Sequence, residues 1–379
     1  VFEYAGQDVA KVEIAVNDGV PIENTLKRGK VSGWKVDQDG FELAGAKIGL
    51  FRFDETEFTG ETALMVTESN EIGYFEFDKV PVGNFLIREI APPEAFVLTE
   101  EIFPVEITEE GQTIEITIEN QIIKGTAETI KVDADYPDHK LSGAVFEVYA
   151  DVDNNGEFDA DIDQLAGEMT ETEPGLYQMK DLVYGNYFLH EKQAPEFFEK
   201  DDGYYPFSIT ENGAIVRIET EAGVGFLNKA QTGSLKVVKT ADDDKVEGRT
   251  FKISGTDFMG NAYEQEFKTD ENGEINLTLR VGEYTVSEVA GEDSEKYILP
   301  DDQTVEIKAG ETTTVKMHNK LVPEVPSVPQ TGDNPWMPAI LSTLAGLAVL
   351  SGGALLFLRY TGKKRKSADQ ADEDQDTEE

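Results

Sequence analysis

A short acidic segment of the sequence has residue types that could bind a metal ion: DVDNNGEFDADID, at residues 151–163. Calcium prefers carboxylate, amide and main-chain oxygens, and a glycine in such a loop permits the sharp turn between them. Gly156 follows acidic or amide residues at alternate positions, as in calcium-binding loops, but Ile162 stands where those loops carry a bidentate Glu. The spacing predicts a calcium site, and the alternative is an acidic hairpin in solvent. The expected ligands are Asp151, Asp153, Asn155, the main-chain oxygen of Glu157, and Asp159.

The composition argues against several other kinds of chemistry. The 379 residues include 33 Lys and Arg against 76 Asp and Glu, so the net charge is -43. Nucleic-acid binding depends on cationic side chains, so no nucleic-acid partner is expected. The absence of cysteine excludes disulfides, thiolate metal sites and cysteine nucleophiles, and three histidines argue against a His-rich metal site.

Three segments of the chain share one order of strands. Each opens with a lysine, in WKVDQDGF, IKVDADYP and VKTADDDK, and continues to a strand that holds a glutamate, in GNFLIREIAPP, GNYFLHEKQAP and GEYTVSEVAGE. Each closes on a strand with an asparagine, in IEITIENQ, GVGFLNKA and TVKMHNK. At both junctions the next opening Lys follows the closing Asn by eleven positions, and Lys35 follows Asn24 by the same distance. The repeat therefore places Asn24 in the last strand of a preceding module, and we expect the chain to be a fragment of a longer protein.

The repeats predict an all-β protein of tandem immunoglobulin-like sandwiches, followed by a C-terminal transmembrane helix. Short alternating runs rich in Val, Ile, Thr, Phe and Tyr are separated by Gly, Asp or Asn turns, and no long helical period competes with them. The predicted domains are a remnant of a preceding module (1–27), module 1 (28–123), module 2 with the acidic insertion (124–231), module 3 (232–321), a Pro-containing linker and motif (322–331), and a tail (332–379).

These repeats resemble the B-type domains of the collagen adhesin Cna and of SpaA-like pilins, which are prealbumin-like β-sandwiches. The resemblance covers residues 28–321 and the end of the preceding module. It implies an isopeptide bond inside each domain, between a first-strand Lys and a last-strand Asn, promoted by a buried acid. The implied trios are Lys35, Glu89 and Asn120; Lys131, Glu191 and Asn228; and Lys239, Glu288 and Asn319. Asn24 has no lysine partner in this sequence, so we expect it to be unreacted.

The chemistry of such a bond accounts for the three residue types. A lysine is a nucleophile only as the neutral amine, and burial disfavours its charged form. A carboxamide is a poor electrophile, but a buried protonated acid can donate to the amide oxygen and pass protons to the leaving ammonia. Contact between amine and amide supplies the effective molarity. The reaction occurs once per domain, so no turnover is expected, and the alternative for each trio is an unlinked surface Lys, Glu and Asn.

Modules 1 and 3 each depart from the expected pattern. In module 3, Glu288 lacks the Ala-Pro that follows the other two glutamates, and Lys236 is a rival nucleophile. In module 1, Trp34 stands beside the lysine, where a small or β-branched residue is usual. YPDHK, which ends at Lys140, faintly resembles a pilin polymerisation motif, but we expect this lysine to be an ordinary loop residue.

The C-terminal region resembles the sorting signal of Gram-positive cell-wall proteins. An uncharged apolar run at 336–358 is long enough to cross a bilayer, and a basic cluster follows it, which predicts that this end stays in the cytoplasm. The preceding motif is Val328, Pro329, Gln330, Thr331 and Gly332, with Val in place of the usual Leu. The resemblance implies that a sortase cuts between Thr331 and Gly332 and joins Thr331 to peptidoglycan. The alternative is a plain membrane anchor.

Together these features predict a secreted, wall-attached structural protein rather than an enzyme. The modules would form a rigid stalk that displays a missing N-terminal region, which would bind an unidentified host or matrix ligand. Three alternatives stay open: a minor or basal pilus subunit, the spacer of a secreted enzyme whose catalytic domain lies upstream, and modules that bind a ligand themselves. The sequence requires no cofactor apart from the predicted calcium.

Overall fold

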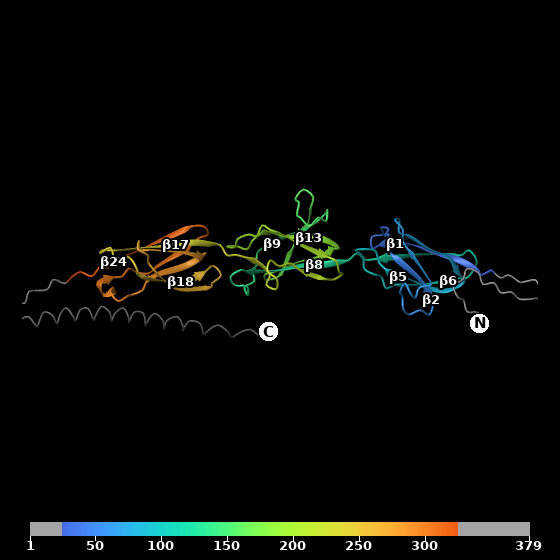
Figure 1. Ribbon diagram of the computed structural model, residues 1–379, viewed down its shortest axis with the longest axis horizontal. Helices are drawn as coiled ribbons and strands as arrows, with labels where there is room; N and C mark the ends of the chain where they lie inside the picture. Colours follow the sequence, from blue (N-terminus) through green and yellow to red (C-terminus); the bar gives the residue numbers. More distant parts are fainter. Residues whose placement is uncertain (1–24, 325–379) are drawn as a thin grey trace, which may run out of the picture. The chain divides into compact units, whose positions relative to one another are not determined.

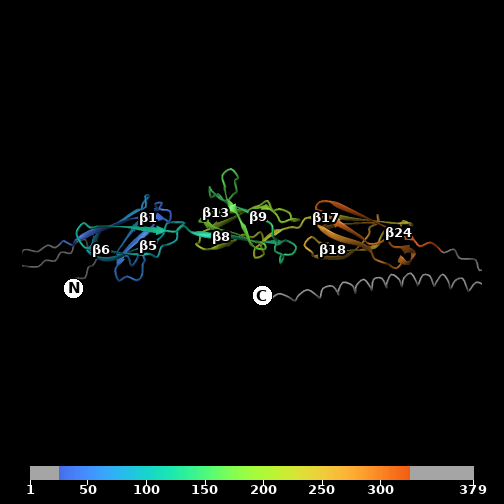
Figure 2. The same ribbon diagram turned by 180° about the vertical axis from the view of Figure 1, so that it is seen from behind.

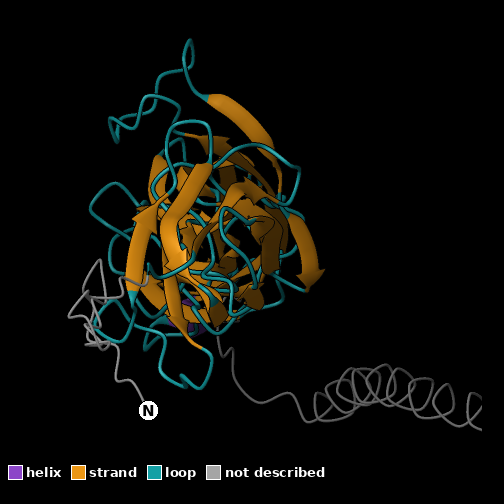
Figure 3. Cartoon of the chain, turned by 90° about the vertical axis from the view of Figure 1, so that its right-hand side faces the viewer, coloured by secondary structure: helices purple, strands orange, loops and turns teal. Residues whose placement is uncertain are grey.

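The computed structural model describes residues 25–324, which Figures 1 and 2 show from opposite sides. Nearly all regular structure in this range is β-strand, and the only helical element there is the 3-10 turn η1 (Ser294–Lys296) (Figure 3). Residues 25–324 contain no helix long and apolar enough to cross a membrane. Asn24, the motif at 328–332 and the apolar run at 336–358 lie outside the described residues. The predicted all-β architecture is confirmed for the described part of the chain.

Module 1 is a sandwich of two sheets. One sheet has the strand order β4-β1-β7 and the other the order β3-β2-β5-β6. The strands are β1 (Arg28–Asp37), β2 (Lys47–Arg52), β3 (Met65–Glu68), β4 (Tyr74–Pro81), β5 (Gly83–Ala91), β6 (Ile102–Ile107) and β7 (Thr113–Asn120). Val31 of β1 and Ile87 of β5 belong to one buried cluster, so the inner faces of both sheets share a single core.

Module 2 repeats this plan with a divided last strand. Its sheets have the orders β10-β9-β13-β14 and β11-β12-β8-β15, and β16 also pairs with β8. The strands are β8 (Lys124–Asp133), β9 (Val145–Ala150), β10 (Gln164–Glu168), β11 (Thr170–Glu173), β12 (Leu176–Val183), β13 (Gly185–Gln193), β14 (Tyr204–Ile209), β15 (Ile215–Arg217) and β16 (Phe226–Asn228). The acidic segment 151–163 joins β9 to β10 and extends away from the sheet (Figure 1).

Module 3 has two four-stranded sheets, in the orders β20-β17-β24-β22 and β19-β18-β21-β23. Its strands are β17 (Thr232–Ala241), β18 (Thr250–Asp257), β19 (Ala262–Lys268), β20 (Glu274–Arg280), β21 (Gly282–Glu288), β22 (Tyr297–Ile298), β23 (Gln303–Ile307) and β24 (Thr312–Leu321). Each of the three modules has a core of its own, formed by side chains of its two sheets. This separation explains why the sequence repeats as discrete units.

In every module the first strand runs parallel to the last strand and is hydrogen-bonded to it. β1 pairs with β7 in module 1, β8 with β15 and β16 in module 2, and β17 with β24 in module 3. The chain therefore enters and leaves each module through two neighbouring parallel strands. A covalent link between these strands would carry tension directly from the entry strand to the exit strand, without loading the other strands of the sandwich.

Candidate functional site

The side-chain alternation of the strands places a lysine inside each core. Along β1, Val31, Gly33 and Lys35 are buried in turn, as expected for residues on one face of a strand. Glu89 follows buried Ile87 on β5 in the same way. The equivalent residues of modules 2 and 3 occupy equivalent inward positions. The nine buried trio residues are Lys35, Glu89, Asn120, Lys131, Glu191, Asn228, Lys239, Glu288 and Asn319.

The strand register is the same in all three modules. In the parallel pair of first and last strands, Lys35 lies opposite Ile118, Lys131 opposite Phe226, and Lys239 opposite Met317. In each case the asparagine follows two residues after the lysine's partner, so it lies on the same face of the sheet. The backbone alone thus brings each lysine near its predicted asparagine, although their sequence separations are 85 residues in module 1 and 97 in module 2.

In module 1 the side chains of Lys35, Glu89 and Asn120 contact one another and are buried from solvent. The Lys35 amine donates hydrogen bonds to Asn120 Oδ1 and, at 3.1 Å, to the carbonyl of Ile118. Glu89 Oε2 accepts a hydrogen bond from Asn120 Nδ2 at 2.9 Å, and Glu89 Oε1 lies 3.7 Å from the amine. The Asn120 amide also donates to the Val97 carbonyl. The amine, the amide and the acid therefore form one closed cluster.

Module 2 repeats this cluster with a shorter contact between amine and acid. Lys131 donates a hydrogen bond to Asn228 Oδ1 and lies 3.0 Å from Glu191 Oε1. Asn228 Nδ2 donates to both oxygens of Glu191 at 2.9 Å. The lysine amine also lies 4.3 Å from the centre of the Phe226 ring. An aromatic face partly compensates for the lost hydration of a cation, but it does not replace a water shell.

Module 3 brings the same residues together with fewer contacts. Lys239 lies 3.1 Å from Glu288 Oε2, and Asn319 Nδ2 donates to Glu288 Oε1 at 2.8 Å. Here, however, the buried Lys239 amine, Glu288 Oε2 and Asn319 Oδ1 have no hydrogen-bond partner. The lysine of module 3 thus faces the acid but does not donate to the amide oxygen.

Burial lowers the pKa of the trio lysines. Desolvation lowers the pKa of Lys35 and of Lys131 from 10.5 to about 8, although the neighbouring glutamates raise it in part. Desolvation also lowers the pKa of Lys239, again against the opposing effect of Glu288. At pH 7 a lysine of pKa about 8 is neutral in about one molecule in ten, against about one in three thousand for a pKa of 10.5. The fold therefore supplies the nucleophilic form of the amine.

The orientation of the acid differs from the expectation in one respect. The sequence predicted that a protonated acid would donate to the amide oxygen. In all three modules the carboxyl instead accepts a hydrogen bond from the amide nitrogen, which is the leaving group of the reaction. The carboxyl also lies within 3.0–3.7 Å of the amine. This position suits the transfer of protons from the amine to the departing nitrogen, which is the second role that the sequence predicted.

Sequence reasoning missed a backbone contact that holds the acid in two modules. The Thr99 N–H donates to Glu89 Oε2 at 3.0 Å, and the Asp201 N–H donates to Glu191 Oε2 at 2.8 Å. In both modules the donor follows the acid by ten residues. A backbone donor cannot be recognised from residue types. The only signal in the sequence was the ten-residue spacing from the acid to the donor, which occurs in two of the three repeats.

The residues that depart from the pattern lie outside the buried clusters. Lys236 is partly exposed and forms an ion pair with Glu274 at 2.7 Å, so in this structure Lys239 is the buried amine of module 3. Trp34 points to the exposed face of β1 and packs edge-on against Tyr74, where it does not disturb the Lys35 cluster. Lys140 is an exposed residue next to the loop that precedes β9.

The acidic segment of module 2 brings three carboxylates together, one of which was not predicted. Ligand atoms of Asp151, Asp153 and Asp163 lie within 4.8 Å of one another. Asp163 is buried and accepts hydrogen bonds from the Val152 and Asp159 N–H groups. The carboxylate of Asp159 is not part of this group. Asn155 and Glu157 lie on the exposed turn beside Asp153, and Ile162 is exposed.

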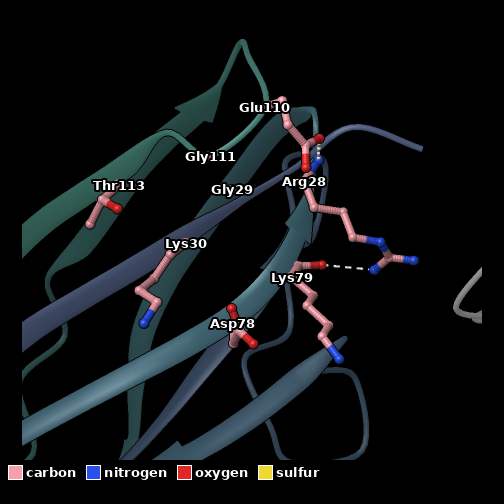
Figure 4. A pocket seen from close by; sticks show the side chains of 8 residues that line it. All are labelled: Arg28, Gly29, Lys30, Asp78, Lys79, Glu110, Gly111 and Thr113. Atoms are coloured by element: carbon pink, nitrogen blue, oxygen red, sulfur yellow. Dashed lines mark hydrogen bonds between the residues drawn. The ribbon is translucent and has the colours of Figure 1, made fainter. Parts of the chain in front are cut away.

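A polar hollow of about 600 Å³ lies at the opposite end of β1 from Lys35 (Figure 4). It is lined by Arg28, Gly29, Lys30, Asp78, Lys79, Glu110, Gly111 and Thr113. Several of its polar groups are bonded to one another or to a neighbour: the Arg28 backbone N–H donates to Glu110, the Arg28 guanidinium donates to the Lys79 carbonyl, and Lys30 forms an ion pair with Glu76. The hollow has no contact with the trio of module 1.

Similarity to one solved structure supports the fold. The Bacillus anthracis TIE protein is similar at 24% identity with a TM-score of 0.58, over 78% of this chain and 51% of that one. This chain thus corresponds to about half the length of that protein. BcpA, the major pilin subunit of Bacillus cereus, is 15% identical with a TM-score of 0.36, over 78% of this chain and 100% of that one. GBS52, the minor pilin of Streptococcus agalactiae, is 19% identical with a TM-score of 0.24, over 55% and 99% of the two chains.

The family comparison is more specific. No curated protein matches the sequence. The prealbumin-like fold domain of SpaA, however, matches three times, at residues 29–122, 125–223 and 233–321. These matches cover most of the chain and coincide with the three sandwiches, which confirms the resemblance predicted from the repeats. The chain belongs to the SpaA prealbumin-like domain family, with three copies of the domain in tandem.

Proposed function

We propose that this protein is a structural stalk of a Gram-positive cell surface, whose modules are clamped by internal isopeptide bonds between Lys and Asn. The observation that carries the proposal is the burial of the side chains of a lysine, a glutamate and an asparagine together in each module. Taking a lysine charge out of water into a core costs several kcal/mol even beside a glutamate, so its presence in all three modules favours a functional role. Formation of an amide from the amine and the carboxamide removes both the charge and its cost.

The proposed reaction forms one bond and breaks one. The neutral lysine Nζ attacks the asparagine Cγ, the new C–N bond forms, and the bond from Cγ to Nδ2 breaks. The glutamate carboxyl takes a proton from the attacking nitrogen and delivers one to the leaving nitrogen, which departs as ammonia. No oxidant, metal or cofactor is required. Each module reacts once, so the protein acts on itself and is not an enzyme with turnover.

The position of the bond suits a stalk that carries force. Lys35 lies near the end of β1 and Asn120 ends β7, and these neighbouring strands lead into and out of module 1. A covalent link between them carries tension past the intervening chain, because the two residues are 85 positions apart. By analogy with disulfides, closing a loop of this length stabilises a module by about 4 kcal/mol. A protein without cysteine thereby gains an extracellular cross-link that reductants do not break.

We also propose that the protein is secreted and attached to peptidoglycan by a sortase. This proposal rests on the sequence alone: the motif at 328–332, the apolar run at 336–358 and the basic cluster occur in the order of a wall-sorting signal. A minor or basal pilus subunit is the main alternative. It would need a lysine that joins one subunit to the next, and Lys140 has only a faint motif around it. A host or matrix ligand would be bound by the region that precedes this sequence.

A calcium site in module 2 is a second proposal, and one observation supports it. Asp151, Asp153 and Asp163 bring three carboxylate oxygens within 4.8 Å, a spacing that a cation with oxygen ligands can bridge. Asp163 replaces Asp159 in the proposed ligand set. Calcium would fix the loop that joins β9 to β10.

The acid can be tested by replacing Glu191 with Gln. We expect Glu191→Gln to stop the loss of ammonia from module 2, because glutamine cannot relay the proton, while module 1 still reacts. Intact mass of the full chain, followed by mapping of branched Lys–Asn peptides, measures both modules. Glu147→Gln is the matched control, since Glu147 pairs with Lys192 at 2.8 Å outside the trio. Normal linkage of module 2 in Glu191→Gln would contradict the proposed role.

The rate of linkage should depend on pH. The pKa of the free Lys35 and Lys131 amines is lowered to about 8, so the reactive neutral fraction rises about tenfold per pH unit below pH 8 and then levels off. We expect this profile for the rate at which modules 1 and 2 lose ammonia after dilution of the full chain from denaturant. A rate that is flat between pH 6 and pH 8 would show that deprotonation of the amine does not limit the reaction.

Wall attachment can be tested with Thr331→Ala in a Gram-positive host. The substitution keeps the main-chain carbonyl but removes the threonine side chain from the motif that the sortase would recognise, so it should move the protein from the peptidoglycan fraction to the membrane fraction and the medium. Gln330→Ala, at the variable position of the motif, is the control and should remain attached to the wall. Wall attachment that persists in Thr331→Ala, or in a strain without sortase, would exclude sortase anchoring through this motif.

Calcium binding can be tested by titration calorimetry of the full chain. We expect Asp163→Asn to weaken calcium binding by about tenfold or more, because one charged ligand is lost from a small site. Glu157→Gln should leave the affinity unchanged, since this residue is proposed to bind through its main-chain oxygen. Absence of calcium-dependent heat in the unmodified chain would exclude the site.

A further inference from the structure

The loop that follows the acid can be aligned between modules by its pairing with the last strand. Phe96 forms a bridge with Ile122, Phe198 with Ala230, and Tyr297 with Leu321. In each module the bridge partner lies two residues after the trio asparagine. The three aromatic residues are therefore structurally equivalent. The acid precedes the aromatic residue by seven positions in modules 1 and 2 but by nine in module 3. An alignment of the loops by distance from the acid would therefore not match these three aromatic residues.

The N–H groups that hold the acid lie three residues after these aromatic residues. They belong to Thr99 in module 1 and Asp201 in module 2. The equivalent residue of module 3 is Pro300. Proline has no backbone N–H, so this position cannot donate a hydrogen bond to the acid. Module 3 therefore lacks the backbone donor that the other two modules have at this position.

The trio of module 3 shows the consequence. Glu288 Oε2, which no backbone group holds, has no hydrogen-bond partner in the structure. The carboxyl turns this oxygen toward Lys239, at 3.1 Å. The Lys239 amine also lacks the hydrogen bond to the amide oxygen that Lys35 and Lys131 both make. Of the three trios, only that of module 3 leaves both its amine and its amide oxygen without hydrogen bonds.

We propose that the backbone N–H of Thr99 and of Asp201 positions the acid for isopeptide formation, and that module 3 forms its bond more slowly because Pro300 removes this donor. The inference rests on the proposed cross-linking function and adds the order in which the modules react. Thr99 and Asp201 are positioning residues, since they act on the acid and not on the reacting atoms.

Two physical effects support the slower reaction. A hydrogen bond from the backbone N–H to Oε2 fixes the carboxyl so that the amine can approach the amide. Small displacements of reacting groups have large effects on rate. In module 3 the amine also makes no hydrogen bond to the amide oxygen, so it is not held in contact with the group that it attacks. We expect bond formation in module 3 to be at least about tenfold slower than in modules 1 and 2.

The test is to follow the three bonds separately while the full chain folds. The chain is diluted from denaturant at pH 7, quenched at intervals and digested, and the branched Lys–Asn peptide of each module is measured by mass spectrometry. We expect the peptides of modules 1 and 2 to appear together and that of module 3 to lag. Pro300→Thr should restore the N–H and accelerate module 3 by about tenfold or more, with no change in modules 1 and 2.

Two further variants separate positioning from folding. Leu299→Ala, in the same loop, is the matched control and should leave the rate of module 3 unchanged. Thr99→Pro should slow module 1 alone, and circular dichroism shows whether the variant folds as the parent does. If Thr99→Pro fails to fold, Pro300→Thr still decides the question, because it gains a donor.

The outcomes distinguish the two proposals. Equal rates in all three modules, or a Pro300→Thr variant no faster than its parent, would overturn the positioning role and leave the cross-links intact. Absence of branched peptides from every module would overturn the proposed cross-linking itself.

Discussion

The burial of a lysine amine in an apolar core is the constraint on which the rest of each module depends. A charged amine at this depth is unfavourable, so it needs either a carboxylate beside it or conversion to an uncharged group. The structure supplies a glutamate 3.0–3.7 Å away and, in modules 1 and 2, an amide oxygen that accepts the lysine N–H. The same burial that makes the lysine costly also lowers its pKa to about 8 in modules 1 and 2, which makes it nucleophilic. The unfavourable free energy of burying the lysine and its nucleophilicity thus have the same cause.

The topology of the sandwich determines where such a cluster can be useful. The first and last strands of each module are parallel neighbours, so their side chains meet although they are far apart in the sequence. The third member comes from a strand of the opposite sheet, β5, β13 or β21, and closes the cluster from across the core. A link at this point joins the entry and exit strands and involves both sheets. A surface ion pair could not do this, because water and salt would reduce its contribution to about 1 kcal/mol or less.

Much of this arrangement could be predicted from the sequence. The repeated Lys, Glu and Asn, with constant gaps between modules, identified the strands and the family, and Lys35, Glu89 and Asn120 lie together as the alternation requires. The sequence could not reveal which oxygen the acid uses, because side-chain orientation depends on the surrounding loop. It also missed Asp163, which lies one position beyond the expected end of the calcium loop, since backbone N–H donors and not spacing place its carboxylate. The sorting motif lies outside the described residues and stays a sequence prediction.

The role of Pro300 shows why sequence comparison between the repeats was insufficient. The missing Ala-Pro after Glu288 was visible, but its effect depends on a two-residue change in the length of the loop. The bridge between Tyr297 and Leu321 restores the alignment at the far end of that loop and places a proline where the other modules have an N–H. A proline there leaves the fold unchanged, because the sheet pairing does not use this N–H. It changes only the environment of the acid, so the modules can share one architecture and still differ in reactivity. A stalk with one slowly closing module would remain extensible at that module until its bond forms, while the two others already resist tension.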